Sequence, residues 1–312
     1  MITIKRYTDS DRQLWNEFLR TSKNGYFLFY REYMEYHRDR FSDFSLLFFE
    51  DDRLVAIMPA NLKDGVLHSH QGLTYGGVIS DAHMSQNRML SLFESLISFG
   101  REQSWTTLVY KAIPFFLHKV PSHEDSYALF RLGAKLTRVD CSSTIDLRAP
   151  ISMSSSKKSG ARKALRESIS LSRSEDFDTF FSMVHSRLTA RYQTKPVHTA
   201  AEMEQLAGNF PDNIVLYTAS RREEMLAGVL VYVDGHFVHS QYISSTEEGR
   251  NLRAVDALVS HLVFEQYSDR FYFDFGISTV EQGLVLNETL CRQKEEFGAS
   301  TTVNNFYELN FL

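Results

Sequence analysis

The stretch FDFGISTVEQGLVLNETLCRQKEEFGA (residues 273–299) carries a strand pattern that runs into a helix pattern. Aromatic residues alternate around Asp274 and stop at a glycine, which predicts a buried strand. A helix is expected over about 283–297, with a glycine directly after it. Asn287 and Lys294 stand seven residues apart on this helix and therefore share one side of it. Its apolar side would be formed by Leu286, Leu290 and Phe297.

The second half of the chain shows a longer order of elements around this stretch. Two helices come first, followed by three strands, a helix, a strand, the helix just described and a last strand. Asp234-Gly235 joins two of the strands and is typical of a hairpin turn. The predicted ranges are helices 159–169, 176–192, 251–267 and 283–297, and strands 214–221, 225–235, 236–244, 270–276 and 301–311.

The first half repeats the same order, and this repetition predicts the domain organisation. We expect two domains of one fold, 1–150 and 151–312, joined at the serine-rich segment 148–160. The fold class is α/β (α+β), in which each domain is a mixed, mainly antiparallel sheet flanked by helices. The predicted ranges are helices 9–22, 30–39, 86–103 and 122–134, and strands 44–50, 53–62, 106–114 and 142–147. The segment 65–79 takes the place of the third strand, but its glycines and two histidines make it more loop than strand.

Length and composition limit the class of protein. A chain of 312 residues can form one large domain or two smaller ones. Its net charge of −5 argues against DNA as a partner, because DNA binding needs a basic surface. Cys141 and Cys291 are too few for a disulfide framework and fit a reducing compartment. The chain lacks a signal-peptide pattern and the ~20 apolar residues of a membrane span, so we expect a cytoplasmic protein.

Several short stretches resemble a known family. They are SHQGLTYGG (69–77), YKAIP (110–114), YALFRLGA (127–134), PVHT (196–199), FDFGIS (273–278) and RQKEEFGA (292–299). Together with the duplicated element order, they resemble the FemAB-like tandem GNAT acyltransferases of bacterial surface-polysaccharide biosynthesis. The resemblance implies a transferase that moves an acyl group from acyl-CoA to an amino group of a sugar or cell-envelope precursor.

The resemblance also implies a role for each domain. The C-terminal domain would bind the donor, acetyl-CoA or another acyl-CoA, and carry catalysis. The N-terminal domain would be degenerate and would bind the acceptor, an amino-sugar or peptidoglycan-type molecule, or have a structural role. Two alternatives stay open: an aminoacyl-tRNA-dependent ligase like FemX, and a degenerate acyltransferase that acts as a non-catalytic binding subunit. The sequence predicts no oligomeric state.

The donor site is expected at the entry of the predicted helix 251–267. GNAT domains that bind coenzyme A usually carry the turn Gln/Arg-x-x-Gly-x-Gly/Ala there, and its N–H groups hold the diphosphate. In this chain the turn begins with an arginine but lacks the glycines. The basic segment 157–166 is a second source of cations for phosphate groups. The structural alternative is that this segment forms a basic helix whose charges face the solvent. The candidate phosphate contacts are Arg250, Asn251, Arg253, Arg162 and Lys163.

Amide formation needs a base that accepts a proton from the amine. Asp274 is the first candidate, because a carboxylate at the end of an aromatic strand needs a partner; the structural alternative is an ion pair with Lys294. His198 is a loop histidine whose ordinary pKa suits a base. Gln241 and Tyr242 lie on the strand that lines the transfer point in GNAT folds, and would orient the acceptor.

Contacts to the substrate are expected in both domains. His70 and Tyr75 lie in a glycine-rich region, where the backbone can approach other groups closely. Lys111 ends a strand, where its charge would bind a phosphate. Asn287 and Lys294 would form one wall of a cleft for a polar substrate. No second cluster of cysteines or acids stands at metal-ligand spacing, so no metal is expected.

Overall fold

The computed structural model describes residues 2–312, and of residues 191 and 192 only the backbone. Two compact units make up the chain. The first consists of Met1–Asp140, Glu281–Leu284 and Val303–Leu312, and the second of Cys141–Val280 and Val285–Thr302. The sequence analysis assigned the last strand to the second domain, whereas the residues from Val303 onward lie in the first unit.

The first unit builds its sheets from short strands. Its elements are β1 (Ile2–Arg6), η1 (Asp9–Asp11), α1 (Arg12–Thr21), η2 (Phe27–Phe29), α2 (Arg31–Met34), η3 (Glu35–His37), β2 (Leu46–Glu50), β3 (Arg53–Met58), β4 (Asn61–Lys63), β5 (Val66–His68), β6 (Ile79–Ser80), α3 (Gln86–Glu102), β7 (Thr107–Lys111), η4 (Phe115–Leu117) and α4 (Glu124–Arg131). Two strands, β8 (Lys135–Asp146) and β16 (Ser300–Asn310), have residues in both units. The strands pair in the orders β1-β2-β3-β6 and β4-β5-β7-β16.

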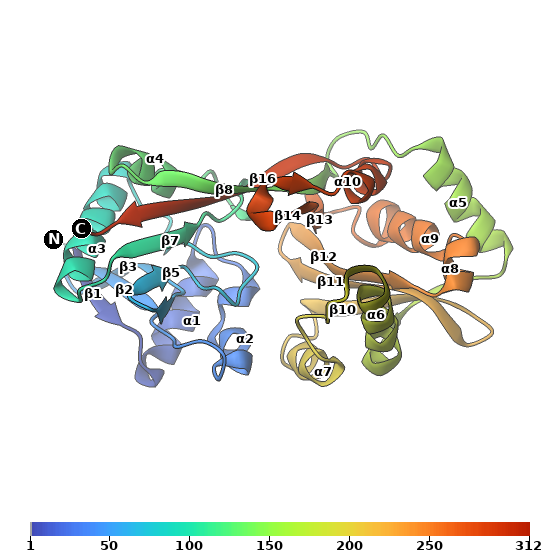
Figure 1. The fold of residues 1–312 in the computed structure, drawn as a ribbon, viewed down its shortest axis with the longest axis horizontal. Helices are drawn as coiled ribbons and strands as arrows, with labels where there is room; N and C mark the ends of the chain where they lie inside the picture. The colour runs from blue at the N-terminus through green and yellow to red at the C-terminus, as the bar shows by residue number, and fades with distance from the viewer. Residues whose placement is uncertain (1) are drawn as a thin grey trace. The chain divides into compact units, whose positions relative to one another are not determined.

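Helix α3 shows how the sequence produces this unit. Ser85 caps its N-terminus by accepting a hydrogen bond from the backbone N–H of Arg88. The helix packs against β1 and α4 (Figure 1). Its apolar residues lie three or four positions apart, so they enter one core. Fully buried members of this core include Phe48, Met58, Leu92, Phe93, Leu96, Leu108 and Phe311.

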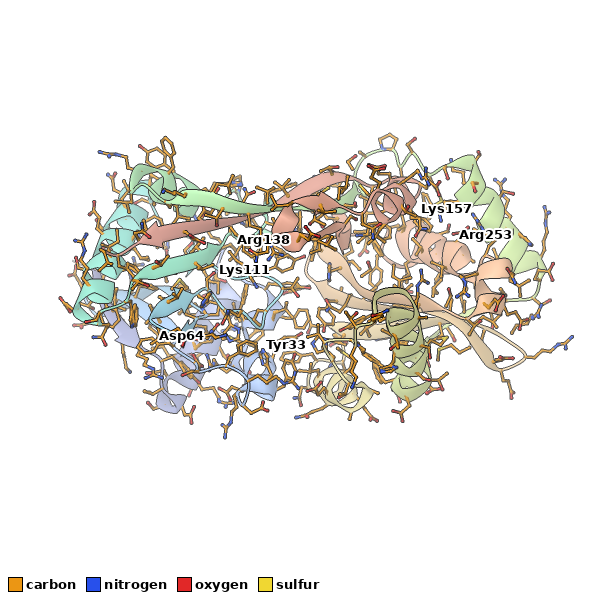
Figure 2. The ribbon with its side chains drawn as sticks, viewed as in Figure 1. Tyr33, Asp64, Lys111, Arg138, Lys157 and Arg253 are labelled. Atoms are coloured by element: carbon orange, nitrogen blue, oxygen red, sulfur yellow. The ribbon has the colours of Figure 1, made fainter. Side chains whose placement is uncertain are left out.

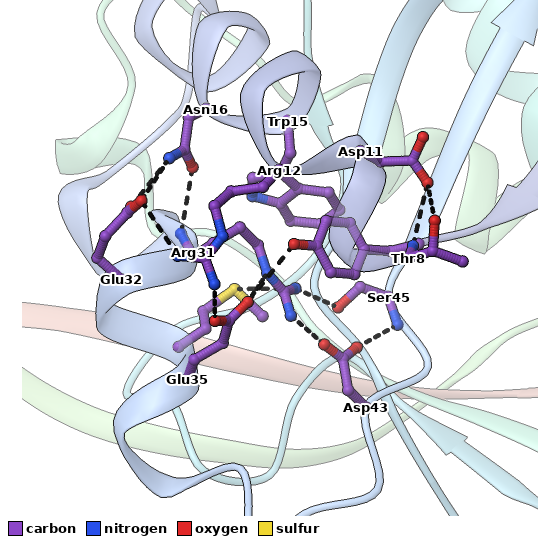
Figure 3. A network of polar contacts seen from close by, with 12 residues as sticks. Thr8, Asp11, Arg12, Trp15, Asn16, Arg31, Glu32, Glu35, Asp43 and Ser45 are labelled. Atoms are coloured by element: carbon purple, nitrogen blue, oxygen red, sulfur yellow. Dashed lines mark hydrogen bonds and ion pairs between the residues drawn. The ribbon is translucent and has the colours of Figure 1, made fainter.

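A polar network fixes the start of α2 in the first unit (Figure 3). Arg31 is 2% exposed, and its guanidinium group pairs with Glu35 at 3.1 Å and with Asp43. Its guanidinium carbon lies 3.7 Å from the ring centroid of Tyr7, a cation–π arrangement. Arg12 also pairs with Glu35. Because each buried charge has a partner, removing one partner would leave an uncompensated charge in the interior.

The second unit has one sheet with helices on both faces. Its elements are α5 (Ser155–Arg166), β9 (Ser170–Ser174), α6 (Phe177–Tyr192), α7 (Ala200–Asn209), β10 (Ile214–Arg221), β11 (Glu224–Asp234), β12 (Phe237–Ser245), α8 (Glu247–Asn251), α9 (Ala254–His261), the π-helical turn Leu262–Gln266, β13 (Tyr272–Ile277), β14 (Thr279–Val280), β15 (Val285–Leu286) and α10 (Glu288–Glu295). The turn η6 (Glu281–Gly283), between β14 and β15, belongs to the first unit. The strands pair in the order β8-β13-β12-β11-β10-β9. Helices α5 and α9 lie on one face, and α6 and α7 on the other (Figure 1).

Each unit contains a parallel strand pair. In the first unit β5 pairs with β7, and the register places His68 opposite Val109. In the second unit β12 pairs with β13, and the register places His239 opposite Asp274. Each parallel ladder covers only three residue pairs and ends at its histidine. The two strands of each pair then separate, which positions the site described below.

Several predicted elements are corrected by the structure. The helix predicted over 251–267 is broken at Arg253, which has a φ of +63° and separates α8 from α9. The helix predicted over 283–297 begins only at Glu288, because β14 and β15 form a hairpin before it. The helix predicted over 30–39 is a single α-turn followed by η3. The sequence analysis also missed β1, α7 and β9, all of which lack a strong apolar period.

Candidate functional site

The second unit brings an imidazole and a carboxylate together at the end of the parallel pair β12–β13. Asp274 is completely buried, and His239 is 6% exposed. Nδ1 of His239 lies 2.7 Å from Oδ2 of Asp274. A carboxylate that accepts a hydrogen bond from Nδ1–H leaves Nε2 as the basic nitrogen of a neutral imidazole. The pair therefore has the arrangement of an oriented general base.

Hydroxyl groups of β8 hold the other oxygen of Asp274. Ser142 Oγ and Thr144 Oγ1 each donate a hydrogen bond to Oδ1 at 2.9 Å. Burial alone would raise the pKa of Asp274, but the hydrogen bond and charge of His239, together with the two hydroxyls, outweigh it and lower this pKa below its ordinary value. The carboxylate is thus ionised in the interior, where it orients and stabilises the imidazole.

Gly276 allows β13 to pass close to the imidazole. It has a φ of +72°, a conformation that favours glycine. A Cβ atom at this position would lie 3.2 Å from Cε1 of His239, tighter than ordinary van der Waals contact. A larger residue would therefore strain the backbone and push the ring away from its place beside Asp274.

Lys294 lies near this pair but does not bind Asp274 directly. Its Nζ donates hydrogen bonds to the carbonyl oxygens of Gly276 at 2.8 Å and Ile277 at 2.7 Å, and to Oγ of Ser278 at 2.9 Å. Burial lowers the pKa of Lys294 to about 8, although the charge of Asp274 opposes this shift. The structural alternative of an Asp274–Lys294 ion pair is therefore wrong, because His239 takes that place and the ammonium holds the end of β13.

Helix α10 presents to the interior a different side from the predicted one. Asn287 is its N-cap, and its Oδ1 accepts a hydrogen bond from the backbone N–H of Leu290 at 3.1 Å. Leu286, predicted to be apolar core, is 44% exposed. Asn287 therefore has a structural partner, and Lys294 lies on the buried side. Residues buried on this side are Cys291, Lys294 and Phe297.

Gln241 and Tyr242 lie at a β-bulge. The ladder pairs Leu230 with Tyr242 and the next residue of β11 with Ser240, so Gln241 has no opposite residue. The bulge interrupts the alternation that the sequence predicts for this strand. Oε1 of Gln241 is buried and has no hydrogen-bond partner among the described residues. The hydroxyl of Tyr242 lies 2.9 Å from Nδ1 of His198, which is 5% exposed, so these two candidates are brought together.

The turn expected to bind the donor begins earlier than predicted. Helix α8 is capped by Thr246, and its first turn carries Glu247 and Glu248. Carboxylates at a helix N-terminus compete with a phosphate for the same N–H groups and repel it. The guanidinium group of Arg250 donates to the carbonyl oxygen of Ser245 at 3.1 Å, so it stabilises the turn itself.

The other basic candidates bind groups within the second unit. Arg253 lies 2.5 Å from a carboxylate oxygen of Asp256, and Lys157 lies 3.1 Å from the other oxygen (both cations are labelled in Figure 2). Lys163 donates to the backbone carbonyl of Asn251 at 3.0 Å. Arg162 is exposed, and no ion pair of it is found in the described part of the chain. The predicted solvated basic helix therefore has a buried side, which holds α5 against α9.

The first-unit candidates lie largely in the interior. His70 is 3% and Tyr75 is 2% exposed, so neither presents its side chain to solvent. Nδ1 of His70 accepts a hydrogen bond from the N–H of Gly72 at 3.2 Å, and burial lowers the pKa of His70 to about 3. Lys111 donates to the carbonyl oxygens of His70, at 3.2 Å, and of Leu73. Burial and the charge of a nearby arginine lower the pKa of Lys111 to about 8.

Among the described residues, no group of three His, Cys, Asp or Glu side chains could hold a metal ion. No helix in residues 2–312 is long and apolar enough to cross a membrane.

His239 is the residue that the sequence analysis missed. It was assigned to a strand face with Gln241 but not selected as a base. A signal was present, because a GNAT order of elements places the strands 236–244 and 270–276 side by side and parallel. That order makes the two strands neighbours, but the register that places His239 opposite Asp274 comes from the structure.

Comparison with known proteins identifies the fold. Residues 154–281 match the model of the acetyltransferase (GNAT) domain, and both His239 and Asp274 lie within this range. No curated protein sequence matches the chain. Its structure is similar to the crystal structure of FemX (12% identity, TM-score 0.69, 97% of this chain and 96% of that chain). It is also similar to a conserved protein of unknown function from Bacteroides thetaiotaomicron VPI-5482 (11%, 0.60, 99% of each chain) and to a tandem GNAT protein from the clavulanic acid biosynthesis pathway (9%, 0.53, 100% and 99%).

These similarities define the class of the molecule. The chain has the tandem GNAT fold, which confirms the predicted fold class and the resemblance to FemAB-like proteins. The matched GNAT acetyltransferase domain lies almost entirely in the second unit.

Proposed function

We propose that this chain is an N-acyltransferase whose second unit carries out the chemistry. The observation that carries the proposal is the His239–Asp274 pair inside the matched GNAT domain. An imidazole that a buried, ionised carboxylate holds through Nδ1–H can accept a proton at Nε2. His239 lies at the last residue pair of the parallel β12–β13 ladder, the point at which the two strands diverge in GNAT folds.

In the proposed reaction, His239 acts as the general base through Nε2. The amine nitrogen of the acceptor attacks the acyl carbon and gives its proton to the imidazole. Asp274 holds Nδ1–H and stabilises the imidazolium that forms. As the bond between the acyl group and the leaving group breaks, the imidazolium returns the proton to the departing sulfur or oxygen. One amide bond forms, one thioester or ester bond breaks, and no proton is gained or lost overall.

Two donors fit this chemistry, and each is supported by one observation. The GNAT acetyltransferase match favours acetyl-CoA or another acyl-CoA. The acidic first turn of α8, with Glu247 and Glu248, disfavours the diphosphate of coenzyme A, and the similarity of the fold to FemX supports an aminoacyl-tRNA as the alternative donor. The proposed acceptor is an amino group of a sugar or a cell-envelope precursor in the cytoplasm, which rests on the resemblance of the sequence motifs.

Thermal unfolding and a transfer assay test the proposal together. A ligand at one hundred times its dissociation constant should stabilise the folded chain by ~2.7 kcal/mol. Acetyl-CoA and aminoacyl-tRNA are therefore added separately, and each is then incubated with amino-sugar nucleotides and peptidoglycan precursors. The proposal expects stabilisation by one donor and formation of an amide product. Stabilisation without product would favour the non-catalytic binding subunit, and an absence of both would overturn the assignment.

A further inference from the structure

Helix α4 and the start of β8 expose an unusual set of apolar side chains in the first unit. Phe130 is 76% exposed, and Tyr127 on the same side of the helix is 49% exposed. Leu136, at the start of β8 and after the turn that follows α4, is 53% exposed. Arg131 and Lys135 are exposed in the same segment. We call these five residues the α4–β8 surface.

The charge of this region is opposite to that of the whole chain. Between residues 111 and 139 the only acids are Glu124 and Asp125, although the chain carries a net charge of −5. Glu124 pairs with Lys23 at 2.6 Å, and Asp125 is 7% exposed and accepts a hydrogen bond from the hydroxyl of Tyr110. Neither acid therefore offsets the exposed cations. No ion pair of Arg131 or Lys135 is found in residues 2–312.

We propose that the α4–β8 surface binds the surface of a membrane that contains anionic lipids. Exposed aromatic side chains flanked by arginine and lysine suit the boundary between head groups and acyl chains. Phe130 and Leu136 would enter the acyl boundary, while Arg131 and Lys135 would contact lipid phosphates. The inference does not depend on acyl transfer, because it uses none of the residues of the proposed reaction.

A membrane fits this surface better than a protein partner does. A stable protein interface takes about 20–30 residues from each side, often with a pocket for an aromatic anchor. Here five residues project from a helix and a turn. On a membrane each side chain adds its own contribution, roughly fivefold in affinity for a cation near anionic lipid and at least about tenfold for a buried phenylalanine. Reversible, salt-sensitive binding is the expected result.

Cosedimentation of the full chain with lipid vesicles tests the proposal. One set of vesicles is phosphatidylcholine alone, and the other contains equal parts of phosphatidylcholine and phosphatidylglycerol. Wild-type protein should bind the anionic vesicles at least about tenfold more tightly, and about 0.5 M salt should remove most of this preference. Phe130→Ser should weaken binding to the anionic vesicles about tenfold. The double variant Arg131→Glu, Lys135→Glu should abolish the preference for phosphatidylglycerol.

Matched variants in the second unit serve as controls. Phe264 is a 44% exposed aromatic residue and Arg166 is an exposed cation, so Phe264→Ser and Arg166→Glu should leave vesicle binding unchanged. Thermal unfolding checks that every variant is folded. The proposal is overturned if wild-type protein does not bind vesicles, if binding ignores lipid charge, or if the controls weaken it equally. It is also overturned if the surface instead mediates self-association that Phe130→Ser removes.

Discussion

The parallel strand pairs of the two units have the same register but different chemistry. In the second unit His239 faces Asp274, and in the first unit the corresponding His68 faces Val109. Burial and nearby lysines lower the pKa of His68, so this imidazole is neutral and has no acid opposite it. The duplicated fold thus kept its backbone arrangement in both copies, while the carboxylate that orients the imidazole occurs in one.

The buried lysines of the two units are similar in their role. Lys111 donates hydrogen bonds to backbone carbonyls of the turn that carries His70, and Lys294 donates to the carbonyls that end β13. Each has a pKa lowered to about 8, chiefly by burial. Lys111 does not take the place of Asp274, because the register puts Val109 opposite His68 and Lys111 lies two residues beyond. In both units, therefore, a buried lysine holds backbone carbonyls in place. The units differ in the His239–Asp274 pair, which the second unit has.

The largest expected effect comes from breaking the His239–Asp274 pair, for which we propose a catalytic role. Asp274→Asn removes the charge that orients His239, and loss of a general base costs about 10²- to 10⁴-fold in turnover. Turnover is measured with whichever donor and acceptor give an amide product. Because a general base must be unprotonated, turnover should fall at low pH, and Asp274→Asn should move this acidic limb of the pH–rate profile, a change that a purely structural effect would not cause.

The first unit offers the matched control for this variant. His68→Gln changes the histidine at the same register in the other copy, and turnover should stay within about twofold, since this position has no facing acid. If both variants lose turnover equally, the carboxylate opposite His239 does not give the second unit a catalytic role that the first unit lacks. Unchanged turnover in Asp274→Asn would exclude the carboxylate from the reaction.

The next largest effect concerns stability, and it contrasts the buried cations of the two units. Arg31→Met leaves the carboxylate of Asp43 without its partner, and breaking a buried pair in this way costs about 3–5 kcal/mol. Lys157→Met should cost less, about 1 kcal/mol, because Arg253 remains 2.5 Å from Asp256. Chemical denaturation of both variants measures the difference. Equal losses would mean that the network around Arg31 does not hold the first unit more tightly than Lys157 holds the second.

The fold was predictable from the sequence to the extent that its patterns are local or repeated. Apolar periods predicted α3, α6, β10 and β11, and the repeated order predicted two units of one fold. The start of α10 was not predictable from the period of Leu286 and Leu290, because the hairpin β14–β15 depends on pairing between residues and not on their pattern. Likewise, Asp274 was selected because a charge in an aromatic strand is costly, but its partner His239 depends on strand register, which one sequence does not specify.

The smallest expected effect is a change in how stability depends on pH. His70 has an ordinary pKa of 6.5 when unfolded and a pKa of about 3 in the fold, because it is buried. Between these values the unfolded chain binds a proton that the folded chain does not, so the free energy of unfolding falls as the pH is lowered from 6.5 to about 3. The slope from this one group is at most roughly 1.4 kcal/mol per pH unit.

His70→Asn should remove that slope and keep the fold, because asparagine tolerates the φ of +68° at this position. Burial also lowers the pKa of His37, and that of His118 to about 4, so the wild-type chain retains some acid sensitivity and the test is the difference between wild type and variant. Unfolding free energies are measured between about pH 4 and pH 7. His185→Asn, at an exposed position of the second unit, is the control and should leave the curve unchanged. If His70→Asn has the same pH dependence as wild type, the acid sensitivity does not arise from this buried histidine, and the contrast with His239, which is hydrogen-bonded to Asp274, loses its electrostatic basis.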